Sequence, residues 1–75
     1  MQRFGVDEKT LQRLRDEYPK GTKIELIELE DSYRKIPAGT IGTVQFVDGA
    51  GNIHMNWETG SSLSLIYGVD VWKKL

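Results

Sequence analysis

Residues 37–66 carry the pattern that most constrains the fold of this chain, PAGTIGTVQFVDGAGNIHMNWETGSSLSLI. Short stretches in which apolar and polar residues alternate are separated by glycine-rich turns, and such alternation is typical of strands with one buried face. The turn DGAGN follows the first stretch and the turn TG follows the second, as expected for β-hairpins. The segment therefore predicts a meander of antiparallel strands.

The alternation assigns a face to most residues of the meander. We predict strands over residues 40–48 and 52–58 and a further strand after the turn TG. Val44 and Phe46 are expected to share one face of the first strand, and Gly42 marks a bend or a close backbone approach. A row of apolar side chains on the other two strands is expected to face the core: Ile53, Met55, Trp57, Leu63 and Leu65.

A short helix is predicted ahead of the meander, over residues 7–18. Asp7 is a good N-cap, because its carboxylate can accept hydrogen bonds from the free amides of the first turn. Pro19 ends the helix, because the residue before a proline is pushed out of the helical region. The helix has a narrow apolar stripe, which suits it to cover an open end or an edge of a barrel: Leu11, Leu14 and Tyr18.

Two further strands are expected outside the meander. The first covers residues 22–30, and the last covers residues 71–75 after a turn at residues 67–70. Within the first strand the apolar residues change face. A β-bulge near Leu26 explains this change, as does a strand covered on both faces. We favour the bulge, combined with cover from the helix.

One helix and five short strands favour a mainly β fold. We predict a small five-stranded SH3-like barrel over residues 22–75, preceded by the helix over 7–18 and by a flexible N-terminus over 1–6. A five-stranded OB barrel is the alternative. It would normally have a helix between its third and fourth strands, where this sequence has only TG.

Composition excludes several classes of protein. The chain has 75 residues and no cysteine, so neither disulfides nor a thiolate zinc site can compensate for a small core. The formal net charge is -1, which disfavours non-specific binding to nucleic acid. No apolar run approaches the roughly 20 residues that span a bilayer, and the N-terminus lacks the apolar segment of a signal peptide. We expect a soluble cytoplasmic protein.

The motifs GTIGTV, VDGAGNIHMNWETGSSLSLI and GVD resemble a family of short domains of unknown function found in Gram-positive bacteria and in their phages and mobile elements. The family pattern is approximately GTxGTV, VD, a glycine turn and IxVxW(D/N)xGSxLxLIPGxD, and the similarity covers residues 18–75. This chain departs from it at Tyr67, where the family has proline, and at Glu58, where it has aspartate. The resemblance implies an SH3-like barrel in mobile DNA but no activity.

His54 is the only histidine, and it is the natural candidate for a general base. A base needs a nucleophile and an orienting carboxylate within reach, and along its own strand His54 has only Asn56 and Glu58 on the same face. We therefore predict no catalytic residue and no enzymatic activity. One histidine with scattered carboxylates also lacks the ligand spacing of a metal site, so no metal and no cofactor is expected.

Four residues are the candidates for contact with a protein partner: Tyr33, Arg34, Tyr67 and Trp72. The first two lie in the long polar segment EDSYRKIP, and small barrels often carry binding residues on such loops. The competing interpretation is that Tyr33 folds onto the barrel and Arg34 is solvated. Trp57, in contrast, is expected in the core because it shares the face of Ile53.

A second set of candidates is basic and would contact nucleic acid: Lys20, Lys23, Arg34 and Lys35. Most basic residues here have acidic neighbours in the sequence, which is usual for a mixed solvated surface. We therefore expect a non-catalytic binding module that recognises a protein partner in a phage or mobile element. A nucleic-acid-binding accessory protein, and a counter-defence protein that inhibits a host factor or sequesters a ligand, stay as alternatives. The oligomeric state is open.

Overall fold

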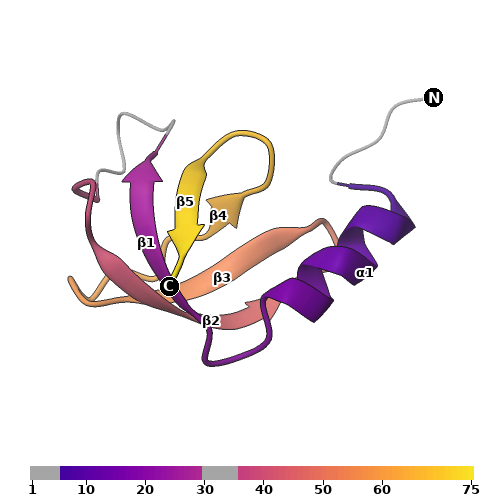
Figure 1. Cartoon of the computed structure of the whole chain (residues 1–75), viewed down its shortest axis with the longest axis horizontal. Coiled ribbons are helices and arrows are strands. Elements are labelled where there is room, and N and C mark those ends of the chain that lie inside the picture. The colour runs from indigo at the N-terminus through magenta and orange to yellow at the C-terminus, as the bar shows by residue number, and fades with distance from the viewer. Residues whose placement is uncertain (1–5, 30–35) are drawn as a thin grey trace.

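The computed structural model describes residues 6–29 and 36–75 (Figure 1). The strands form one antiparallel sheet in the order β4-β3-β2-β1-β5. The fold is therefore mainly β with one helix, as predicted. The elements, in chain order, are α1 (Glu8–Glu17), β1 (Lys23–Glu28), β2 (Ile41–Val47), β3 (Asn52–Trp57), β4 (Leu65–Ile66) and β5 (Val71–Lys74).

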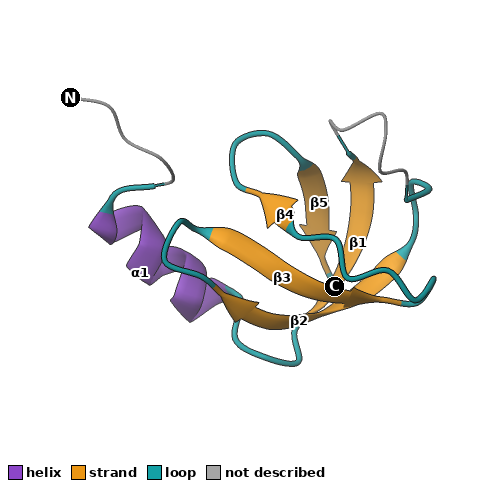
Figure 2. Ribbon diagram, turned by 180° about the vertical axis from the view of Figure 1, so that it is seen from behind, coloured by secondary structure: helices purple, strands orange, loops and turns teal. Residues whose placement is uncertain are grey.

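The sheet is strongly curved. β4 and β5 lie at opposite ends of the strand order, yet only residues 67–70 separate them in the chain. The two edges of the sheet must therefore approach each other, and Figure 2 shows β4 beside β5. Among the described strands no ladder joins β4 to β5, so the sheet is open. A curved five-stranded sheet is confirmed, whereas the predicted closed barrel is not.

Both edges of this sheet are poor templates for another strand. β4 contains only two residues and begins at Leu65. The alternation had predicted a longer strand that includes Leu63. Leu63 is still partly buried against the core. β5 ends with Lys73 and Lys74, and lysines on an edge strand oppose pairing with further strands.

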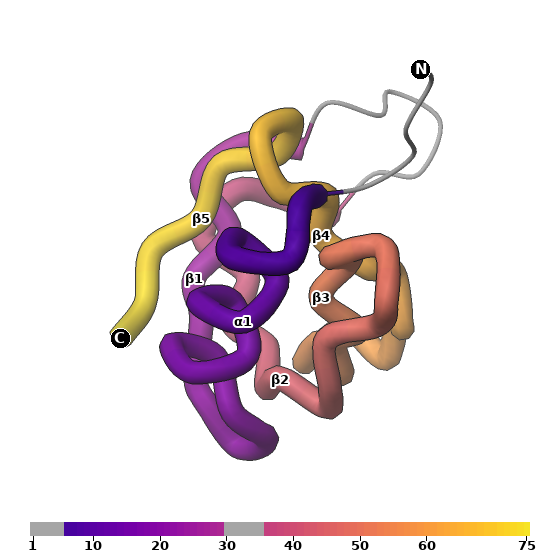
Figure 3. Tube along the Cα trace, turned by 90° about the vertical axis from the view of Figure 1, so that its right-hand side faces the viewer, coloured from indigo at the N-terminus to yellow at the C-terminus, as the bar shows by residue number. Residues whose placement is uncertain are grey.

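The helix follows the sequence prediction closely. The Asp7 carboxylate accepts a hydrogen bond from the amide of Thr10 at 2.8 Å, and Tyr18 is the C-cap. Leu14 is buried in the core, and the guanidinium of Arg15 donates to the carbonyl oxygen of Val47 at 3.3 Å from Nη2. α1 therefore packs beside the end of β2, and it lies in front of the sheet when the molecule is viewed from this end (Figure 3).

The core lies inside the curve of the sheet and combines residues of α1 and the strands. Trp57 is its largest member, and its indole N–H donates to the carbonyl oxygen of Leu63 at 2.8 Å. A Cβ added at Gly42 would lie 2.5 Å from Cε3 of Trp57. The predicted close approach at Gly42 is thus confirmed, with an indole ring as the neighbour. The buried apolar residues are Leu14, Ile24, Leu26, Ile36, Val44, Val47, Ile53, Met55, Trp57 and Leu65.

Two β-bulges change the faces of the strands. The register of β1 against β5 shifts between Leu26 and Glu28, which confirms the bulge predicted near Leu26. The register of β2 against β3 also shifts, between Val44 and Phe46. The extra residue reverses the alternation, so Val44 is buried while Phe46 is 54% exposed. The prediction that both share one face is therefore wrong.

Candidate functional site

The bulge in β2 places Phe46 in a row of outward side chains that crosses three segments of the chain. Phe46 lies opposite His54 in the β2–β3 register. The pairing of Ile53 with Leu65 brings Ser64, just before β4, to the other side of His54. Asp48 lies at the adjoining β2–β3 turn. We call Phe46, Asp48, His54 and Ser64 the His54 cluster.

The imidazole of His54 is held on both edges and on one face. Its Nε2 lies 2.8 Å from Oδ2 of Asp48, and its Nδ1 lies 3.2 Å from Oγ of Ser64. The Phe46 ring stacks on it with centroids 4.2 Å apart and planes 9° apart. The side chains of His54 and Asp48 keep 35% and 30% of their exposure. The cluster is therefore ordered by its own contacts and still accessible from solvent.

Asp48 also closes the hairpin turn. Its Oδ1 accepts hydrogen bonds from the amides of Ala50 at 3.0 Å and Asn52 at 2.9 Å. Burial by itself would raise the pKa of Asp48, but the hydrogen bonds from His54, Asn52 and Ala50 and the attraction of His54 outweigh it, so the pKa lies below its usual value. Asp48 is therefore an ionised hydrogen-bond acceptor at neutral pH.

This arrangement was not predicted from the sequence, because the partners of His54 lie on other segments than its own strand. Asn56 and Glu58 were the only partners considered for His54, whereas the actual partners come from the preceding turn and the following segment. A signal was available in VDGAGNIH. Once Asp48 pairs with Asn52 across the hairpin, as the hydrogen bond from the Asp48 amide to the Asn52 carbonyl requires, His54 becomes its diagonal neighbour.

A second surface feature is the connection between β4 and β5, which we call the apolar turn and define as residues 66–71. It presents four large apolar side chains that are 40–47% exposed. Among the described residues it holds four of the seven exposed large hydrophobics. Exposed apolar side chains gathered in one short segment mark a contact surface more often than singly scattered ones do. The four residues are Ile66, Tyr67, Val69 and Val71.

The backbone of the apolar turn is fixed by Asp70. This residue is 8% exposed, and its Oδ2 accepts a hydrogen bond from the amide of Ile66 at 2.9 Å. The Asp70 amide donates in return to the carbonyl oxygen of Ile66 at 3.0 Å. Gly68 has φ +84°, a conformation that other residues rarely adopt. The apolar side chains are thus displayed on a defined scaffold.

The predicted contact residues have different environments. Tyr33 and Arg34, together with Lys35, lie outside the described residues. Tyr67 is exposed on the apolar turn, and its hydroxyl accepts a hydrogen bond from Nη2 of Arg13 at 3.1 Å. Trp72 is half-buried against the core.

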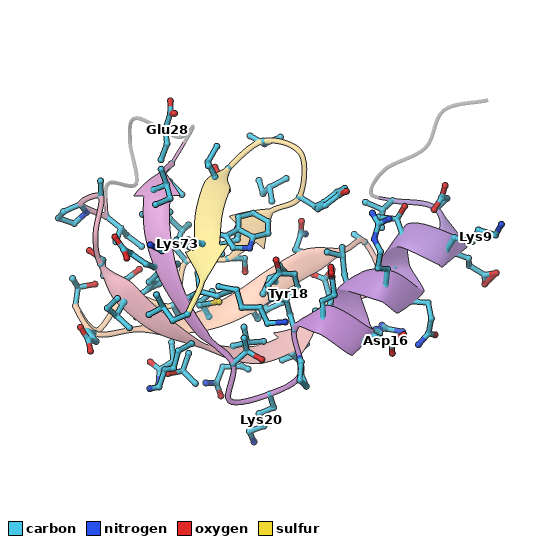
Figure 4. All side chains as sticks on the ribbon, in the orientation of Figure 1. Lys9, Asp16, Tyr18, Lys20, Glu28 and Lys73 are labelled. Atoms are coloured by element: carbon cyan, nitrogen blue, oxygen red, sulfur yellow. The ribbon has the colours of Figure 1, made fainter. Side chains whose placement is uncertain are left out.

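Trp72 meets the ring of Tyr18 edge-on at 6.0 Å between centroids and 74° between planes. Figure 4 shows Tyr18 at the end of α1, near β5. Trp72 therefore connects β5 to the helix. Of the predicted partner-contact residues that the structure describes, Tyr67 is the exposed one.

The described basic candidates differ as well. Lys20 extends away from the sheet on the turn after α1 (Figure 4). Lys23 donates from Nζ to Oγ1 of Thr43 at 2.8 Å. Lys74, which was not among the candidates, lies over the Tyr18 ring at 5.3 Å from its centroid. Lys23 and Lys74 are thus engaged in contacts within the protein.

Neither a metal site nor a membrane span is found in the part of the chain that the structure describes. In residues 6–29 and 36–75, no three His, Asp or Glu side chains are grouped as metal ligands. Within the same ranges, no helix has the length and apolar character to cross a bilayer.

Comparison with protein families gives one match. The model of a domain of unknown function, DUF4314, matches residues 7–75, a range that includes α1 and all five strands. Comparisons with curated proteins and with solved structures found no match.

Proposed function

The chain belongs to the DUF4314 family, and we propose that this member is a non-enzymatic module that binds a protein partner through its apolar turn. We further propose that its sheet is a variant of the SH3-like barrel, with the connection between β4 and β5 bringing the two edges together. The sequence resemblance supports a phage or mobile-element setting inside a bacterial cell. The choice of the apolar turn as the binding surface is based on its exposed apolar side chains.

The observation that carries this proposal is the concentration of exposed apolar surface in residues 66–71. Burying such side chains against a partner removes apolar area from water, at about 25 cal/mol per Å². Tyr67 adds a large aromatic ring, and aromatic residues are enriched among those that dominate binding energy. No other described stretch of six residues presents as many exposed large apolar side chains.

Rigidity of the turn supports the same function. The hydrogen bonds between Asp70 and Ile66 hold the turn in place before any partner arrives. A preorganised surface loses less conformational entropy on binding than a loop that must first be ordered. The apolar turn therefore has the properties of a preorganised binding surface and not of a flexible linker.

Charge around the turn indicates the chemistry of the partner. Arg13 contacts Tyr67. Lys73 and Val71, in contrast, lie opposite Glu25 and Glu28 in the β1–β5 register, so Arg13 is the cation that distinguishes this surface. A partner that presents an apolar segment with a carboxylate beside it would complement Tyr67 and Arg13. We therefore expect an amphipathic surface with a carboxylate on the partner protein.

The experiment is capture of proteins from bacterial lysate on the immobilised chain, comparing the wild type with Tyr67→Ser/Val69→Ser. We expect the double variant to retain at least about tenfold less of any specific partner, because two central contacts are lost. Leu75→Ser is the matched control, since Leu75 is 60% exposed at the far end of β5. It should capture as well as the wild type.

Two outcomes would contradict the proposal. A partner retained equally by the double variant and the wild type would place the contact elsewhere, for example on the segment that contains Tyr33 and Arg34. Capture that disappears after nuclease treatment, and that weakens steeply with salt, would favour the nucleic-acid alternative. The variants should first be shown to be folded by circular dichroism.

A further inference from the structure

The His54 cluster contains a hydroxyl, an imidazole and a carboxylate in one hydrogen-bonded chain, and protein binding by the apolar turn does not use it. We infer that Ser64 is a reactive serine, primed for covalent acylation by activated esters. The inference concerns a modification site that reacts once per chain. It is separate from the proposed partner surface and stands or falls independently of it.

The direction of the hydrogen bonds makes Ser64 a donor to His54. Asp48 is ionised and can only accept, so when the imidazole is neutral its ring proton lies on Nε2, toward Oδ2 at 2.8 Å. Nδ1 then has a free lone pair, and Oγ of Ser64 lies 3.2 Å from it. The hydroxyl proton of Ser64 therefore points at a base whose opposite edge is bound to a carboxylate, as in activated nucleophiles.

The surroundings of the imidazole hold it in this orientation. Phe46 covers one face of the ring from β2, Asp48 contacts it from the β2–β3 turn, and Ser64 contacts it from the segment before β4. Asp48 is the charged group that the structure places against His54. Because Ser64 is partly exposed, a small reagent can reach the hydroxyl at the end of the chain of hydrogen bonds.

The reaction follows from this arrangement. The Oγ of Ser64 forms a bond to the carbonyl carbon of the ester while its proton moves to Nδ1 of His54. The bond between that carbon and the leaving group then breaks, and the leaving group departs with the electron pair. The imidazolium gives its proton to the leaving group or to solvent, which restores neutral His54. The product is an ester of Ser64, and nothing is oxidised or reduced.

Only activated aryl esters or thioesters are expected to react. Their leaving groups depart readily, whereas amides require strong stabilisation of the tetrahedral oxyanion, which is worth on the order of 10²–10³ in rate for one donor. General-base assistance from a positioned histidine typically contributes about 10²–10⁴. The His54 cluster provides general-base assistance.

The experiment treats the folded chain with 4-nitrophenyl acetate and locates the acetyl group by peptide mass spectrometry. Residues 36–72 contain no lysine or arginine, so a tryptic peptide covers the cluster without lysine acetylation inside it. Ser62 is an internal comparator, because it is more exposed than Ser64. Exposure alone predicts faster acetylation of Ser62, whereas activation by His54 predicts that Ser64 reacts at least about 10²-fold faster.

Variants test each link of the chain. His54→Asn should lower acetylation of Ser64 about 10²-fold and leave Ser62 unchanged. Asp48→Asn acts through His54, so the rate at Ser64 should fall and its dependence on pH should change, which a merely structural role would not produce. Asn52→Ala is the matched control. It removes the weaker hydrogen bond from Asn52 Nδ2 to Asp48 at 3.4 Å and leaves His54 and Ser64 in contact.

Wild-type protein alone can overturn the inference. If Ser64 and Ser62 of the folded chain are acetylated at similar rates, or if Ser62 reacts faster, the cluster only fastens the hairpin. Acetylation in urea gives the rates without structure, and the preference for Ser64 should vanish there. Circular dichroism identifies any variant that has lost its fold. A folded His54→Asn variant with undiminished acetylation of Ser64 would also overturn the role of His54.

Discussion

The β2–β3 turn and the apolar turn use the same device for different ends. In each, an aspartate side chain accepts a backbone hydrogen bond and fixes the connection between two strands. Asp48 does so at a half-exposed position, where it also holds His54. Asp70 does so while nearly buried, and the side chains around it are apolar. The β2–β3 turn thus orders polar side chains that are hydrogen-bonded to one another, whereas the apolar turn exposes hydrophobic side chains to solvent.

The comparison shows that a fixed turn does not reveal its function until its neighbours are known. An exposed carboxylate can exchange protein donors for water, so its hydrogen bonds contribute modestly to stability. A buried carboxylate has no such substitute. The two turns should therefore respond differently to equivalent substitutions, in ways that test both interpretations.

The largest expected effect comes from replacing the two aspartates. Asp70→Ala should lower the free energy of unfolding by about 2–3 kcal/mol, because the amide of Ile66 loses its acceptor next to the core. Asp48→Ala should lower it by about 1 kcal/mol, because water can replace the carboxylate. Urea unfolding followed by tryptophan fluorescence measures both values. Equal losses would mean that the two turns are equally important for stability.

The glycines with positive φ give a second comparison, of intermediate size. Gly68 has φ +84° and open space around it, whereas a Cβ at Gly51, with φ +87°, would lie 2.7 Å from Cγ2 of Val6. Gly68→Ala should therefore lower the free energy of unfolding by about 1 kcal/mol from backbone strain alone. Gly51→Ala should lower it by about 2 kcal/mol, since Val6 must also move.

A double substitution separates the two causes of the Gly51 effect. In a background that carries Val6→Ala, the added Cβ no longer meets the valine methyl groups, so Gly51→Ala should have nearly the same effect as Gly68→Ala. Thermal or urea unfolding of the four proteins of this cycle measures the coupling. A coupling energy near zero would show that Val6 moves aside freely.

The smallest effect is expected in the pH dependence of stability. The folded-state pKa of Asp48 is lowered, so its stabilising contribution is present above the unfolded pKa, about 3.9, and is lost as the pH falls through the folded value. The difference in unfolding free energy between wild type and Asp48→Asn should therefore shrink from neutral pH to about pH 3. Asp16→Asn, an exposed carboxylate of α1, is the control for general acid effects.

Much of the fold could be read from local pattern. Asp7 and Pro19 bound the helix because capping and proline sterics act within a few residues, and the alternation in β3 correctly placed Trp57 in the core. Phe46 was placed wrongly because Val44, Gln45 and Phe46 keep the apolar–polar alternation across the bulge of β2, whereas in β1 a change of face marked the bulge. Whether the sheet closes into a barrel also depends on twist and long-range pairing, which no short stretch encodes.

The candidate sites were less predictable than the fold. The His54 cluster depends on the register of three segments, and a search for partners along one strand could not find Asp48 or Ser64. Tyr67 was predicted to contact a partner and is exposed in the structure, but the sequence does not show that its apolar neighbours are exposed beside it. Asp70 looked like an ordinary turn residue, because burial of a carboxylate follows from the tertiary fold.

The position of β5 in the sheet determines how a partner bound to the apolar turn would change the stability of the protein. β5 pairs with β1, so Leu26 and Trp72 become neighbours only after a long loop has closed, a slow and entropically costly event in folding. The apolar turn ends with Val71, the first residue of β5, so the docking of β5 against β1 fixes where the turn lies on the protein. A partner bound there selects chains in which β5 is docked, and by linkage it raises their resistance to unfolding. We therefore expect a bound partner to protect the chain from proteolysis.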